Sequence, residues 1–75
     1  MEEQLIKERL LAENLEFRRL HDEHRDHDLR LSELSAKPFL TSEEEIRERE
    51  LKKRKLLLKD KMAIIMRDFQ KSLQG

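Results

Sequence analysis

The chain has no cysteine, which excludes disulfide bonds, thiol redox chemistry and zinc sites built on Cys ligands. Its single glycine, Gly75, leaves no glycine-rich loop to hold a phosphate group, and no spacing pairs a nucleophile with a base. We therefore expect neither a cofactor nor enzymatic activity. Lack of thiols is compatible with a reducing compartment, and the cytoplasm is the expected location.

Long hydrophobic runs are also absent. The most apolar window, residues 56–66, is interrupted by Lys59, Asp60 and Lys61, so it is too short and too charged to span a bilayer. The acidic residues 1–4 lack the positive charge of a secretory signal, and no apolar segment follows them. These features predict a protein without membrane contact.

Charged residues dominate what is present, at 45% of the 75 residues against 36% hydrophobic ones. Neither sign is in excess, since 17 basic residues balance 17 acidic ones. This composition suits helices that bury one stripe and expose the rest. A chain of this length forms one small domain, and its core contributes only about 3 to 5 kcal/mol, so self-association is an expected source of stability.

Pro38, the only proline, disfavours helix at the preceding residue and cannot continue one itself. Shortly after it, Thr41 or Ser42 can cap a second helix, because each has a glutamate three positions later that can close a capping box. The sequence thus predicts a single domain over residues 1–75, with helix one over about 2–34, a loop over 35–41 and helix two over about 42–73.

Both helices carry a seam of positions spaced by alternating steps of four and three, as in coiled coils. The first seam is Ile6, Leu10, Glu13, Phe17, Leu20, His24, His27, Leu31 and Leu34. The second is Leu51, Lys55, Leu58, Met62, Ile65, Phe69 and either Ser72 or Leu73. When helix two folds back, the seams match position by position, from His27 opposite Leu51 to Leu10 opposite Phe69. The predicted fold is an all-α, antiparallel, coiled-coil-like two-helix hairpin.

Some apolar residues lie outside these seams. Scattered surface hydrophobes are normal in soluble proteins, which is one interpretation of them. We favour the other, a face that binds a partner, because a lone hairpin cannot bury apolar residues on both sides of a helix. The partner is expected to be a second copy, giving a dimeric helical bundle. The candidate interaction residues are Leu11, Leu15, Leu57, Ile64 and Met66.

Four seam positions hold ionisable side chains, and three of them, His24, His27 and Lys55, lie together in the middle layers of the hairpin. Polar residues in such seams typically fix register, and we expect that role here. A less favoured alternative uses His21, His24 and Asp28, whose steps of three and four place them on one helical face where they could bind a divalent metal.

A basic run in helix two is the one cluster that could meet phosphate. Its candidate anion-binding residues are Lys52, Lys53, Arg54 and Lys59. The run contains no aromatic residue for stacking on bases, and acidic residues flank it. A solvated face, or one paired with acidic helix one, is the favoured interpretation, and nucleic-acid association through residues 52–61 is the alternative function.

Two patterns carry a resemblance to a known family. They are Phe17-x-x-Leu20-x-x-x-His24-x-x-x-Asp28-x-x-Leu31 and Leu51-Lys52-Lys53-x-Lys55-Leu56-x-Leu58-Lys59-Asp60-x-Met62. The chain resembles the YdcH-like family of small bacterial proteins, which implies a helical hairpin or short coiled coil and no established function. His27 stands where that pattern usually has an aliphatic residue. The resemblance predicts an uncharacterised bacterial protein. Because apolar residues remain outside the seams, we expect it to act as an interaction or adaptor module.

Overall fold

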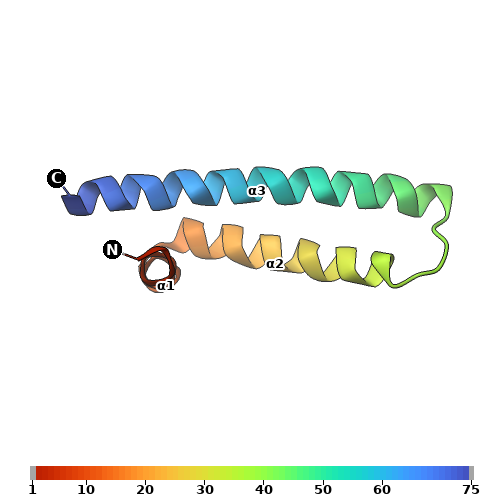
Figure 1. Cartoon of the computed structure of the whole chain (residues 1–75), viewed down its shortest axis with the longest axis horizontal. Coiled ribbons are helices and arrows are strands. Elements are labelled where there is room, and N and C mark those ends of the chain that lie inside the picture. Colours follow the sequence, from red (N-terminus) through yellow and green to blue (C-terminus); the bar gives the residue numbers. More distant parts are fainter. Residues whose placement is uncertain (1, 75) are drawn as a thin grey trace.

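The computed structural model describes the backbone of residues 2–74 and the side chains of residues 2–73. Three helices make up almost all of this part, and no strand occurs in it: α1 (Glu3–Glu13), α2 (Leu15–Ser35) and α3 (Ser42–Gln74). The all-α prediction is confirmed. In Figure 1, α2 and α3 lie side by side and run in opposite directions, in a molecule measuring 51 × 20 × 16 Å. No helix in the described range is long and apolar enough to cross a membrane.

Helix one was expected to be continuous over residues 2–34, and this is wrong. The helix is interrupted at Asn14, whose backbone is extended rather than helical, with a φ of −113° and a ψ of 110°. Its Oδ1 accepts a hydrogen bond of 2.9 Å from the Phe17 N–H and so caps α2. Beyond the break, α1 turns out of line and is seen end-on in Figure 1.

The break has a physical reason in the seam itself. A straight helix would place Glu13 in the seam opposite Ile65, where its carboxylate would lose water. In the folded chain the Glu13 side chain is 60% exposed and pairs with Arg9 at 3.5 Å. Arg18 secures the junction, since its Nε donates to the Leu11 carbonyl at 2.8 Å and its Nη2 donates to the Ala12 carbonyl at 3.3 Å.

Among the side chains that the structure describes, seven apolar ones are buried and form the core, and every one occupies a predicted seam position: Ile6, Leu10, Phe17, Leu34, Leu51, Leu58 and Met62. Phe17 and Leu58 are fully buried. Ile6 and Leu10 of α1 join Phe17 and Met62 in one cluster, against which Ile65 and Phe69 also pack. The out-of-line α1 therefore still delivers its seam residues to the core.

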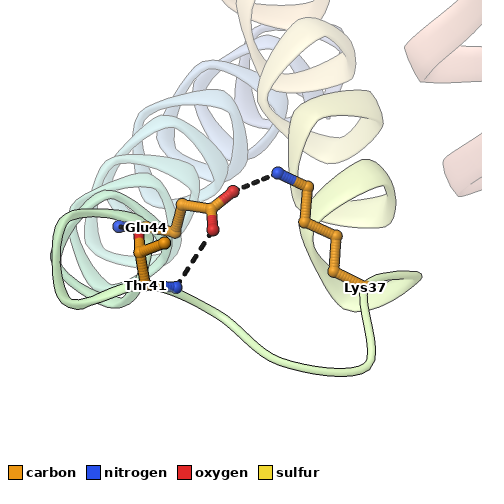
Figure 2. Close-up of polar contacts among 3 residues, drawn as sticks. All are labelled: Lys37, Thr41 and Glu44. Carbon is orange, nitrogen blue, oxygen red and sulfur yellow. Dashed lines mark hydrogen bonds and ion pairs between the residues drawn. The ribbon is translucent and has the colours of Figure 1, made fainter.

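The connection between α2 and α3 covers residues 36–41 and ends in a capping box. Thr41, rather than Ser42, is the capping residue: its Oγ1 accepts from the Glu44 N–H at 3.1 Å, and its own N–H donates to Glu44 Oε1 at 3.0 Å. Lys37 of the loop reaches the other oxygen of the same carboxylate (Figure 2). These bonds hold the pKa of Glu44 below its usual value, chiefly through the hydrogen bond from Lys37.

Candidate functional site

Two ion pairs join α2 to α3 near the middle of the hairpin. Lys55 Nζ donates to Asp28 Oδ1, and Arg54 Nε donates to Glu23 Oε1 at 3.0 Å. Lys55 stands at a seam position, so its methylenes lie along the interface while its ammonium reaches the carboxylate at the edge. Such a pair joins one position of α3 to one position of α2, and the expected role of Lys55 in register stays a prediction.

The same ammonium contributes to a lower pKa of two neighbouring groups. Its hydrogen bond to Asp28 holds the pKa of that carboxyl below the usual value. The pKa of His24 is also lowered, first because partial burial disfavours the charged imidazolium and then because Lys55 is close. His24 is therefore a neutral seam residue at neutral pH.

His27 is the other histidine at a seam position. Its Nδ1 is buried and has no hydrogen-bond partner among the described residues. The ring shares a hollow with Leu51, Arg30 and Arg47, between α2 and α3. An imidazole nitrogen without a partner costs stability, so this position is a weak point of the hairpin.

The metal alternative gains no support from the side-chain positions. Among the residues described, no group of three or more His, Cys, Asp or Glu side chains is placed to hold a metal ion. Of the three candidates, Asp28 is engaged with Lys55, while the carboxylate nearest His21 is Asp22, 3.8 Å from Nδ1.

A groove of about 630 Å³ runs between α2 and α3 beside the ion pair of Lys55 with Asp28. Leu31 and Leu56 supply its apolar lining, and Lys52 and Lys59 are among the polar residues along it. Leu56 is 64% exposed. The seam spacing gave no signal for this groove, because Leu56 lies beside the seam rather than in it. The chemistry of this lining suits the binding of an apolar side chain that has a polar group beside it.

The basic run is partly neutralised. Lys52 Nζ lies 3.4 Å from Glu48 Oε1 in α3, and Arg54 is held by Glu23 of α2. Lys53 and Lys59 are exposed and take part in none of the ion pairs found within residues 2–73. α2 thus neutralises Arg54, whereas the carboxylate beside Lys52 belongs to α3 itself.

The candidate interaction residues fall into two groups. Leu15, Leu57 and Ile64 are exposed by 59%, 45% and 48%. Leu11 and Met66 instead pack against the core cluster, so their expected outer position is wrong. The cause is the break at Asn14, because out-of-line α1 covers a side of α3 that a straight helix would leave open.

Comparison with known proteins gives one match. The family model described as "Protein of unknown function (DUF465)" matches residues 17–66, which is compatible with the resemblance to the YdcH-like family. No curated protein and no solved structure matches the chain. The matched segment contains all but the first two residues of α2, the capped loop and most of α3, and it begins after α1. The chain therefore belongs to the DUF465 family of proteins of unknown function.

Proposed function

We propose that this chain is a non-enzymatic protein–protein interaction module that self-associates in the cytoplasm. The observation that carries the proposal is the exposure of Leu57 and Ile64, which lie one heptad apart on α3. At 3.6 residues per turn they share one side of the helix, well away from buried Leu58 and Met62. α3 thus has an inner face that packs in the hairpin and an apolar outer position that the hairpin leaves open.

A second copy is a suitable partner because the core inside one chain is small. Seven buried side chains stabilise the whole hairpin. A single core in a chain below about 80 residues contributes only about 3 to 5 kcal/mol. Complete burial of an exposed Leu or Ile is worth about 1.5 to 3 kcal/mol, and since Leu57 and Ile64 are 45% and 48% exposed, finishing their burial adds roughly 1 kcal/mol each. Pairing of two copies through α3 would therefore change the total stability appreciably.

Sedimentation equilibrium over roughly 1 to 300 μM chain tests the proposal. We expect the weight-average mass to rise toward twice the monomer mass of 9.2 kDa as concentration increases. The variant Leu57→Asp/Ile64→Asp should stay monomeric over the same range. Leu29→Asp is the matched control, since Leu29 is 59% exposed on α2 and should not affect association.

The control separates association from folding. Far-UV circular dichroism should give the same helix content for all three proteins, because the substituted side chains lie outside the core. A wild-type chain that remains monomeric at every concentration refutes the proposal. Equal association of wild type and the double variant refutes the assignment to α3.

A further inference from the structure

The outer side of α3 carries a defined charge pattern around its two apolar residues. We call this the α3 outer stripe, made of Glu50, Lys53, Leu57, Ile64, Asp68 and Lys71. At 3.6 residues per turn these six positions fall within a sector of about 60°. All six are exposed, and its four charged residues take part in none of the ion pairs found within residues 2–73.

The α3 outer stripe is self-complementary when read in both directions. Leu57 and Ile64 lie equally far from the midpoint between Asp60 and Lys61, and so do Lys53 and Asp68. Glu50 and Lys71 are a third pair of positions at equal distance from the midpoint, and they carry opposite charges, as Lys53 and Asp68 do. When a second copy of α3 runs in the opposite direction about that midpoint, apolar residues therefore face apolar residues and acidic residues face basic ones.

We infer that two copies of this chain pair through the α3 outer stripe, antiparallel, about a two-fold axis between Asp60 and Lys61. This inference deepens the self-association proposed above and rests on it. Leu57 of one copy lies level with Ile64 of the other, and Lys53 lies level with Asp68. The contact extends from Glu50 to Lys71, roughly 30 Å at 1.5 Å per residue.

Other arrangements of the same two faces oppose like charges or bury a charge. A parallel pair in register would face Glu50 with Glu50 and Lys53 with Lys53, and both are repulsive. Sliding the antiparallel pair by one heptad in one direction places Ile64 against Glu50. Sliding it by one heptad in the other direction places Ile64 against a second Ile64, but it also places Leu57 against Lys71. Of the antiparallel registers compared, only the one about Asp60 and Lys61 pairs both apolar residues with apolar residues, and the parallel pair is disfavoured by its like charges.

A charge swap tests this register. In Lys53→Glu, each dimer would oppose the introduced carboxylate to that of Asp68 twice, and in Asp68→Lys it would oppose two lysines twice. Each variant alone should associate at least tenfold more weakly than wild type. An equimolar mixture restores opposite charges in both layers, so it should recover association. Lys59→Glu, on the groove side of α3, is the matched control and should leave the dissociation constant within twofold of wild type.

A cross-link gives a second, independent measurement, because the chain has no cysteine of its own. Facing Cα atoms of helices packed 8 to 10 Å apart are separated by roughly 4 to 6 Å, within disulfide range. Under mild oxidation, a mixture of Lys53→Cys and Asp68→Cys should form the heterodimer disulfide. Lys53→Cys alone should not cross-link, since its two copies lie roughly 22 Å apart along the helix.

The outcomes distinguish this inference from the proposed function. If wild type dimerises but the charge variants behave like wild type, or if Lys53→Cys cross-links to itself, the antiparallel register is wrong and self-association stands. If wild type is monomeric at every concentration, both are wrong. Recovery in the mixture together with the heterodimer disulfide supports both.

Discussion

Replacing Asn14 by alanine tests how the junction between α1 and α2 is held. The substitution removes the 2.9 Å hydrogen bond from the Phe17 N–H to Asn14 Oδ1 and alters none of the seven core side chains. Loss of an N-cap costs roughly 0.5 to 2 kcal/mol, typically about 1 kcal/mol. Against a total of about 3 to 5 kcal/mol for a chain of this size, that is a large fraction. The midpoint of thermal unfolding should fall by about 4 to 8 °C per kcal/mol.

A competing outcome is fusion of α1 and α2 into one straight helix, since alanine is the strongest helix former. Fusion would move Glu13, now 60% exposed, into the seam opposite Ile65. Taking a carboxylate out of water costs several kcal/mol, more than the lost cap. The hydrogen bonds from Arg18 to the α1 carbonyls also persist in the variant. We therefore expect the break to remain and the stability to fall.

Urea denaturation followed by circular dichroism measures the free energy of unfolding, and small-angle scattering measures the radius of gyration. Asn14→Asp is the control, because aspartate is an equally good N-cap and should leave stability nearly unchanged. An Asn14→Ala protein that is as stable as wild type, or that is longer in solution, refutes this account of the junction.

Three further substitutions or conditions have expected outcomes. His27→Leu should raise the free energy of unfolding by about 1 kcal/mol in urea denaturation, since it removes the unpartnered Nδ1, and a decrease would show that the imidazole has a role the hairpin needs. Stability should fall between pH 7.5 and 5.5, because the fold lowers the pKa of His24 and the unfolded chain takes up its proton first, near pH 6.5. In His24→Gln, the melting temperature should fall less steeply with decreasing pH in that window. An equally steep fall would show that another group causes the pH dependence. Thr41→Ala should cost about 1 kcal/mol by loss of the capping box at Glu44, whereas Thr41→Ser keeps the hydroxyl and should cost little.

Much of the fold is readable from local chemistry. Pro38 places the loop, and Thr41 with Glu44 places the start of α3, because both signals act within a few residues. The break at Asn14 was missed because the seam spacing continues through it. A charged residue at a seam position followed directly by a strong capping residue was the available signal. Its effect depends on burial against α3, which no local pattern reports.

The candidate site was readable to a smaller extent. The seam spacing places Lys55 at the interface of the two helices, but it does not identify Asp28 as the partner of its ammonium. The positions of Leu11 and Met66 were not readable, since they depend on the direction in which α1 leaves the junction. The groove beside Leu56 also depends on how two helices diverge, which is a tertiary property.

The position of α1 bears on how the two faces of α3 are used. The family match begins at Phe17, yet Phe17 and Met62 are buried together with Ile6 and Leu10 of α1. α1 therefore covers the inner, core-forming end of the α2–α3 hairpin, where a second copy could otherwise pack. The α3 outer stripe lies on another side of the helix and keeps Leu57 and Ile64 exposed. The inner end is already covered within one chain, so for the dimer that we propose the outer stripe is the face left open to a second copy, and its charges favour a reversed copy over a parallel one.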